Sequence, residues 1–128
     1  MLFDTSFLID LQREIAAGQP HGASRFLLNY PGEVPWISLI SWMEFAEGYP
    51  AERAEACRLF LSRFRVVAMD TEVAWRASRL SRELRQAGQR PSDHDVWVAA
   101  TAIERQLTLV TRNRRHFERI AGLRLLTY

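Results

Sequence analysis

Short apolar segments typical of β-strands alternate along this chain with longer segments that have helical periodicity. The strand-like segments are Leu2–Asp4, Val34–Ile37, Val66–Ala68, Leu107–Thr111 and Arg124–Thr127. The helical segments are roughly Thr5–Ala17, Gly22–Asn29, Leu39–Gly48, Ala51–Phe64, Thr71–Ala87 and Asp93–Arg105. This alternation predicts an α/β fold with a central, mostly parallel sheet. Because the strand-like segments are short and apolar throughout, we expect them to be buried on both faces.

Turn-forming residues separate these segments. Gly18 and Pro20 follow the first helical segment, and Gly88 and Pro91 lie between the two last helical segments. Such residues end helices, because glycine adopts backbone angles that other residues avoid and proline lacks an N–H donor. Ser92 is then the expected N-cap of the Asp93–Arg105 helix.

The length and composition fit one domain, which we expect to cover residues 1–128. Hydrophobic residues make up 48% of the 128, an ordinary value for a globular protein. No apolar run approaches the roughly 18 residues of a membrane span, and the apolar start is interrupted at Asp4, unlike a secretory signal. The single cysteine, Cys57, cannot form an internal disulfide, and we expect it to be a small buried side chain. Together these features predict a cytoplasmic protein.

The basic residues are all arginine. The chain has 17 of them and a formal net charge of only +2. Arginine binds phosphate through two parallel hydrogen bonds and stacks on bases, so this composition suits a nucleic-acid ligand. A genome rich in arginine codons would produce the same composition, and the two explanations stay open.

Acidic side chains follow several of the predicted strands. Asp4 ends the first strand, Glu44 lies on the helix after the second, and Asp95 lies in the first turn of the helix that precedes the Leu107–Thr111 strand. Asn113 comes just after that strand. In parallel α/β sheets, ligands bind beyond the carboxyl ends of the strands. The fold therefore predicts that these residues gather at one edge of the sheet.

Each acid also has a local structural explanation. Asp4 is a favourable N-cap for the helix that begins at Thr5. Glu44 would form a capping box with Ser41, and Asp95 would do so with Ser92. Against these explanations, Glu44 lies three residues before Glu47, and no arginine between residues 32 and 52 offsets their repulsion. Asp95 heads a helix that is apolar on nearly every face, which indicates that its first turn borders an internal cleft.

Several carboxylates in a partly buried cleft need a cation or must take up protons. Oxygen ligands of this kind suit Mg²⁺ or Mn²⁺, which can activate water for attack on a phosphodiester. Two groups of arginines would hold the neighbouring phosphates, unless they simply cover solvated faces. The group beside the proposed site is Arg112, Arg114, Arg115 and Arg119. The other group, on the predicted Thr71–Ala87 helix, is Arg76, Arg79, Arg82 and Arg85.

Four segments, in order, resemble the motifs of the PIN-domain ribonucleases, and within them the VapC toxins of bacterial toxin–antitoxin pairs. They are Leu2–Asp10, Ile37–Gly48, His94–Ala102, and Leu107–Asn113 followed by Phe117. The resemblance runs from residue 1 to about residue 127. It implies a PIN-like three-layer α/β/α fold with four or five short strands and a Mg²⁺- or Mn²⁺-dependent endoribonuclease that cleaves single-stranded or loop RNA. It also implies a homodimer and a VapB-like antitoxin as partner.

The resemblance places both catalysis and metal binding on Asp4, Glu44 and Asp95. Residues near these three acids are expected to support them: Thr5, Ser6, Asp93, Arg112, Asn113 and His116. We expect Asp10 to have a local structural role. Tryptophans at 36, 42, 75 and 97 belong either to the core or to a groove for the partner.

The chain departs from the family at one point. Many relatives carry a fourth carboxylate at or near the positions of Asn113 and His116. We therefore expect one well-occupied metal site without RNA and a second, weak or absent, that fills only with substrate. His116 is then protonated near the acids, acts as a nitrogen ligand, or is simply a surface histidine.

Two other functions compete with this one. A haloacid-dehalogenase-like phosphatase would need a second aspartate where Ser6 stands. A PIN-like scaffold that binds RNA without cutting it is the more serious alternative.

Overall fold

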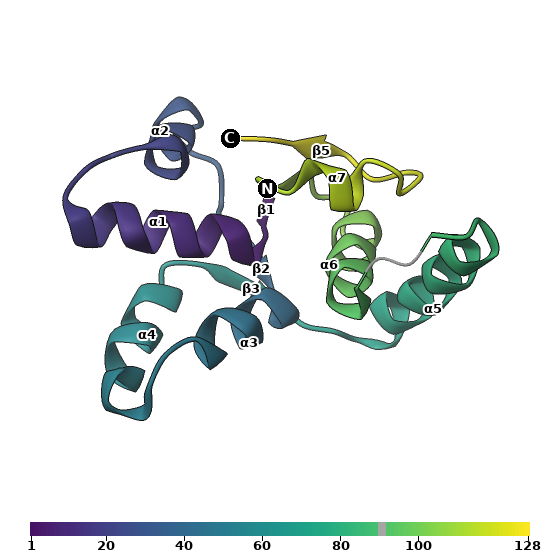
Figure 1. Cartoon of the computed structure of the whole chain (residues 1–128), viewed down its shortest axis with the longest axis horizontal. Coiled ribbons are helices and arrows are strands. Elements are labelled where there is room, and N and C mark those ends of the chain that lie inside the picture. The colour runs from purple at the N-terminus through teal and green to yellow at the C-terminus, as the bar shows by residue number, and fades with distance from the viewer. Residues whose placement is uncertain (90–91) are drawn as a thin grey trace.

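A computed structural model describes residues 1–89 and 92–128, so Pro91, the predicted helix breaker, lies outside the described residues. The described strands form one sheet in the order β3-β2-β1-β4-β5, and every pair is parallel. They are β1 Leu2–Phe3, β2 Trp36–Ser38, β3 Arg65–Val67, β4 Leu109–Val110 and β5 Leu125–Leu126. The predicted mostly parallel sheet of four or five short strands is confirmed (Figure 1).

The helices follow the predicted segments closely. They are α1 Thr5–Ala17, α2 Gly22–Asn29, α3 Leu39–Glu47, α4 Ala54–Leu61, α5 Thr71–Gln86, α6 Asp93–Glu104 and α7 Arg114–Phe117, with a short 3₁₀ helix, η1, at Ala51–Arg53. The first helix ends at Gly18, whose φ of 64° is a left-handed conformation that glycine adopts without a steric cost. Ser92 caps α6 as expected, because its hydroxyl accepts a hydrogen bond from the Asp95 N–H.

Three details differ from the expectation. The segment predicted as one helix over Ala51–Phe64 is divided into η1 and α4. The four-residue helix α7 was not predicted, because four residues carry no readable periodicity. The third strand lies at an edge of the sheet, and Val66 is 42% exposed, so its predicted burial on both faces is wrong. An edge strand has a neighbour on one side only, which leaves part of it open to solvent.

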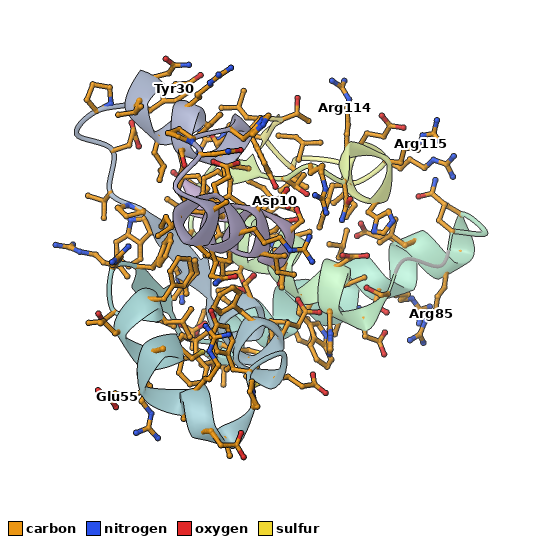
Figure 2. All side chains as sticks on the ribbon, turned by 60° about the vertical axis from the view of Figure 1, so that its left-hand side comes forward. Asp10, Tyr30, Glu55, Arg85, Arg114 and Arg115 are labelled. Carbon is orange, nitrogen blue, oxygen red and sulfur yellow. The ribbon has the colours of Figure 1, made fainter. Side chains whose placement is uncertain are left out.

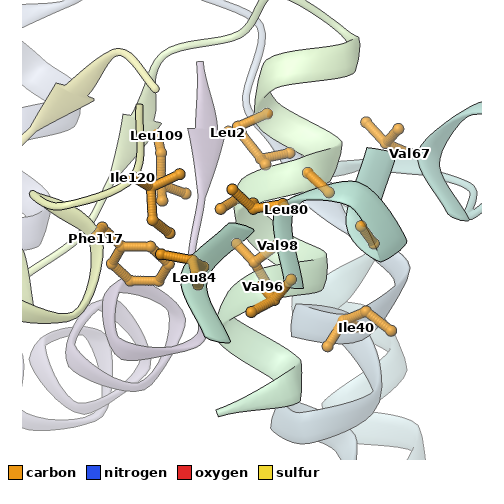
Figure 3. Close-up of a cluster of buried hydrophobic side chains, with 14 residues drawn as sticks. Leu2, Ile40, Val67, Leu80, Leu84, Val96, Val98, Leu109, Phe117 and Ile120 are labelled. Atoms are coloured by element: carbon orange, nitrogen blue, oxygen red, sulfur yellow. The ribbon is translucent and has the colours of Figure 1, made fainter. Parts of the chain in front are cut away.

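The sheet separates two hydrophobic cores. Leu2 of β1 and Leu109 of β4 face the core beneath α5 and α6, whereas Phe3 and Val110 face the core beneath α1, α2 and α4. Successive residues of a strand point to opposite faces, so each central strand contributes to both cores. Figure 3 shows the first of these cores. Because Leu2 is fully buried, its replacement by alanine should cost about 2–5 kcal/mol.

The tryptophans do not belong wholly to either core. Trp36, Trp42 and Trp97 are half-buried against the cores, and Trp75 is 66% exposed on α5. Cys57 is buried, as expected. Within the part of the chain that the structure describes, no helix is long and apolar enough to cross a membrane.

Candidate active site

The central position of β1 determines where Asp4 lies. The Asp4 N–H donates a 3.2 Å hydrogen bond to the carbonyl of Val110, so the residues that follow β1 and β4 lie next to each other. The second strand ends at Ser38 on the other side of β1. The parallel strands therefore deliver Asp4, the start of α3 and Thr111 to the same edge of the sheet.

Asp4 is the most buried of the three predicted acids, with 6% of its surface exposed. It caps α1 by accepting a 3.0 Å hydrogen bond from the Phe7 N–H, so the local structural explanation is correct. The hydroxyl of Ser6 lies 2.7 and 2.9 Å from its two oxygens, and the Thr111 hydroxyl donates to Oδ2. A carboxylate has about four acceptor positions and these three groups supply three protons, so one position stays free.

The environment of Asp4 shifts its proton affinity. Burial raises the pKa of the carboxyl, hydrogen bonds from Thr111, Phe7 and Ser6 lower the pKa, and the negative charge of Asp95 raises it again. The net effect is a raised pKa. Asp4 and Asp95 are therefore close enough to repel each other, which a cation between them would relieve.

Glu44 projects from α3 and is fixed at both oxygens. Thr5 donates its hydroxyl hydrogen bond to Oε2, and Nδ1 of His94 lies 2.6 Å from Oε1. The proposed capping box with Ser41 is wrong, because α3 begins one turn earlier. Ser38 is its N-cap and accepts a 2.9 Å hydrogen bond from the Ser41 N–H.

Asp95 lies in the first turn of α6. Its N–H donates to Ser92, as a cap requires, but its carboxylate points away to His116, whose Nδ1 lies 3.1 Å from Oδ2. The three acids thus come from the end of β1, from α3 and from α6, and each has a fixed partner.

A cavity of about 400 Å³ joins these side chains, and the three predicted acids all line it. Four of the predicted supporting residues line it as well: Thr5, Ser6, Arg112 and Asn113. Two further lining residues, Glu47 and His94, were not predicted to be part of the site. We call it the acidic cavity. His116 is not among the described residues that line the cavity, and it contacts this site through Asp95. Asp93 does not line the cavity but lies in a separate groove between α5 and α6.

Asp10 connects the cavity to the C-terminal segment. Its carboxylate accepts hydrogen bonds of 2.8 and 2.6 Å from one nitrogen of Arg112, and a 2.9 Å bond from the Tyr128 hydroxyl. This ion pair fixes Arg112, which lines the cavity. The expected local role of Asp10 thus extends to holding an arginine beside the acids.

Sequence reasoning missed His94 and Thr111 as partners of the acids. His94 immediately precedes Asp95, so its place in the first turn of a helix beside the cleft was a readable signal. Thr111 ends the strand next to β1, but its bond to Asp4 joins residues 107 positions apart and needs the strand order. Apolar strand ends alone do not specify that order.

The donor set fits a hard divalent cation, because the three predicted acids and Glu47 line one cavity and burial already disfavours the charge on Asp4. Within residues 1–89 and 92–128, however, no three His, Cys, Asp or Glu side chains are gathered as ready metal ligands. Glu44 and Asp95 are instead engaged with His94 and His116.

The family model of the PIN domain matches residues 1–123. The chain belongs to the PIN-domain family.

Known proteins refine this assignment. Over 129 aligned residues the chain is 33% identical to ribonuclease VapC1 of Methanocaldococcus jannaschii, covering 100% of this chain and 86% of that protein. It is 35% identical over 94 residues to the tRNA(fMet)-specific endonuclease VapC of Salmonella typhimurium, covering 70% and 71%. The crystal structure of VapBC2 from Rickettsia felis, bound to a DNA fragment from its promoter, contains a similar chain. That match has a TM-score of 0.84 and 26% identity, and it covers 99% of this chain and 97% of the Rickettsia felis chain. The expected VapC-like ribonuclease with a three-layer fold is confirmed.

Proposed function

We propose that the acidic cavity hydrolyses phosphodiester bonds of single-stranded or loop RNA with the help of Mg²⁺ or Mn²⁺. The convergence of Asp4, Glu44 and Asp95 from three elements on one cavity is the observation that carries this proposal. These three carboxylates would hold the ion, which supplies an activated water and offsets charge on the attacked phosphate. Binding would draw Glu44 and Asp95 away from their histidines.

The neighbouring side chains would orient the acids and the substrate. The hydroxyls of Ser6 and Thr5 fix Asp4 and Glu44 in place. A guanidinium carries five N–H donors, and Asp10 engages only one terminal nitrogen of Arg112. The remaining donors of Arg112 suit a phosphate oxygen at the edge of the cavity.

A VapB-like antitoxin and a second copy of this chain are the proposed protein partners, and a cytoplasmic location fits both. The Rickettsia felis structure pairs a similar chain with its partner VapB. On this chain, Leu39 and Met43 are exposed and lie four residues apart on α3, the helix that carries Glu44. This apolar pair would let an antitoxin segment dock beside the cavity. We treat residues 1–128 as one nuclease domain.

The test is cleavage of single-stranded RNA by the purified chain in Mn²⁺, before and after EDTA is added. Asp95→Asn should abolish the cleavage. Glu55→Gln, which removes the same charge from an exposed position on α4, should leave the cleavage unchanged (Figure 2). Cleavage that persists in EDTA, or in Asp95→Asn, would contradict the proposal. RNA binding without any cleavage would instead support the scaffold alternative.

A further inference from the structure

A second hollow, of about 790 Å³, lies between α5 and α6. We call it the α5/α6 groove. Its α5 wall carries small residues, among them Ala77 and Ser81, together with Arg79, Arg82 and Arg85. Trp97 of α6 lines it on the other side. Figure 2 shows Arg85 projecting outward from the end of α5.

The groove carries excess positive charge. In the described part of the chain, Asp93 is the only acid that lines it, against three arginines. Among residues 1–89 and 92–128, none of these arginines forms an ion pair with a carboxylate, whereas their neighbour Arg76 pairs with Glu104 at 3.0 Å. The guanidinium of Arg79 instead lies 4.7 Å from the ring centre of the exposed Trp75. Arginines spaced three residues apart on one helix repel one another, so an anion in the groove would stabilise them.

The groove and the acidic cavity share a wall, the first turn and a half of α6. Asp93 and Trp97 line the groove, whereas His94, Asp95 and Val98 line the cavity. The rings of His94 and Trp97 lie 5.5 Å apart, so aromatic surface continues from one hollow into the other. An RNA strand whose scissile phosphate lies in the cavity must place neighbouring nucleotides against an adjacent wall.

We propose that the α5/α6 groove is a nucleotide-binding subsite for the RNA strand that the acidic cavity cuts. A base stacks on Trp97, and Arg82 and Arg85 bind the flanking phosphates. This inference rests on the proposed nuclease function. Stacked aromatics beside a basic groove are the usual means of holding single-stranded nucleic acid.

Two other occupants fit the groove less well. A second copy of this chain across a two-fold axis would bring the same three arginines toward these three, which adds like-charge repulsion. An acidic peptide would satisfy the arginines, but it has no need of the aromatic surface that leads to the cavity.

The test measures binding of a single-stranded RNA to the full chain over a range of salt concentrations. The RNA has 12 nucleotides of mixed sequence and a fluorescein label. The chain carries Asp4→Asn and the buffer contains EDTA, so that the RNA is not cut. Adding Arg82→Ala and Arg85→Ala should weaken binding and reduce the slope of log K against log salt by about 1.4, for two lost phosphate contacts. The matched control is Arg58→Ala with Arg63→Ala, two exposed arginines on α4 and just after it. This pair makes the same change in net charge and should leave the slope unchanged.

A second pair of variants tests the stacking. Trp97→Leu should weaken binding about tenfold or more, and Trp97→Phe, which keeps an aromatic face, should retain most of the affinity. Because Trp97 also packs against the core, thermal melting must show that both variants are folded.

Several results would overturn the subsite. One is the absence of measurable RNA binding, and another is groove variants that bind RNA like the control pair. The subsite would also be overturned if the groove variants changed only the oligomeric state, or only lost a co-purifying protein, while RNA binding stayed the same. Cleavage assays with Asp4 intact separate the two proposals. RNA cleavage without any effect of the groove variants would sink only the subsite. Groove-dependent binding without cleavage would sink only the nuclease.

Discussion

Asp4 has a structural role as a helix cap, and the chemical role that we propose for it opposes this structural role. It caps α1, and it also faces the acidic cavity near Asp95. The pKa of Asp4 is raised in the folded chain from its ordinary value of 3.8. At pH values just above 3.8, Asp4 therefore binds more protons in the native state than in the unfolded chain. Stability contributed by this residue therefore falls as pH rises through that range, so the ionised form costs stability at neutral pH.

Replacing Asp4 by Asn should therefore separate stability from activity. RNA cleavage should fall by at least about 100-fold, the order of effect of removing one electrostatic group from an active site. The melting temperature at pH 7 should stay equal or rise, because a buried charge is removed while an acceptor for Phe7 is kept. Mn²⁺ should raise the melting temperature of the unmodified chain and not that of Asp4→Asn. Unchanged cleavage, or a variant that no longer unfolds cooperatively, would show that this assignment is wrong.

The absence of a carboxylate at positions 113 and 116 sets the number of ions that we expect. The three proposed ligands, Asp4, Glu44 and Asp95, exceed the charge of one divalent ion but not of two. Asn113 adds no charge, and Glu47, the fourth carboxylate that lines the cavity, is exposed on α3. Calorimetric titration of the RNA-free chain with Mn²⁺ should find one well-occupied site, with a second that appears only when RNA is added. Two tight sites of similar affinity without RNA would refute the charge argument.

At the scale of the element, α2 depends on a side chain from the preceding helix. Its own N-cap residue, His21, makes no side-chain capping bond. Glu14 of α1 instead accepts hydrogen bonds of 2.9, 3.0 and 2.8 Å from the N–H groups of His21, Ala23 and Ser24. Burial opposes the charge on Glu14, but these bonds and one from the Ser24 hydroxyl lower its pKa to about 2.

Glu14→Gln should destabilise the chain by about 1 kcal/mol at pH 7, the usual value of a helix cap. Because the folded pKa is depressed, the contribution is complete above the ordinary value of 4.5 and is lost as pH falls toward 2. Urea unfolding of both chains at several pH values measures it. The difference should shrink between about pH 5 and pH 2, and a pH-independent difference would show that the charge is not its source.

Local sequence was enough to predict most elements but not the contacts between them. The helices Thr5–Ala17 and Gly22–Asn29 have the predicted bounds, because periodicity and turn residues act within a few positions. The edge position of β3 and the bond from Thr111 to Asp4 depend on strand order, which nearby residues do not encode. Convergence of the three acids was predictable because parallel strands end at one edge. The position of Asp93 outside the acidic cavity was not predictable, since it depends on how α6 is rotated about its axis.

At the scale of the whole molecule, the acidic cavity and the apolar residues of α3 lie close enough for one partner to cover both. If the chain is the toxin of a pair, its expression alone should slow bacterial growth, and co-expression with the product of an adjacent small gene should restore growth. Leu39→Ser with Met43→Ser should weaken co-purification of that product without reducing RNA cleavage. Normal growth on expression of the chain alone would contradict the toxin role.

The strand order also bears on when the chain can act. Among the described strands, β1 is synthesised before the others and lies between β2 and β4, and Thr111, which is synthesised late, donates a hydrogen bond to Asp4. A nascent chain therefore lacks one wall of the acidic cavity until residues beyond 110 have emerged. We expect chains stalled on the ribosome at residue 105 to leave nearby RNA intact, and chains extended by a long linker after residue 128 to cut it. A nuclease assembled in this order would spare the ribosome and messenger that are still making it.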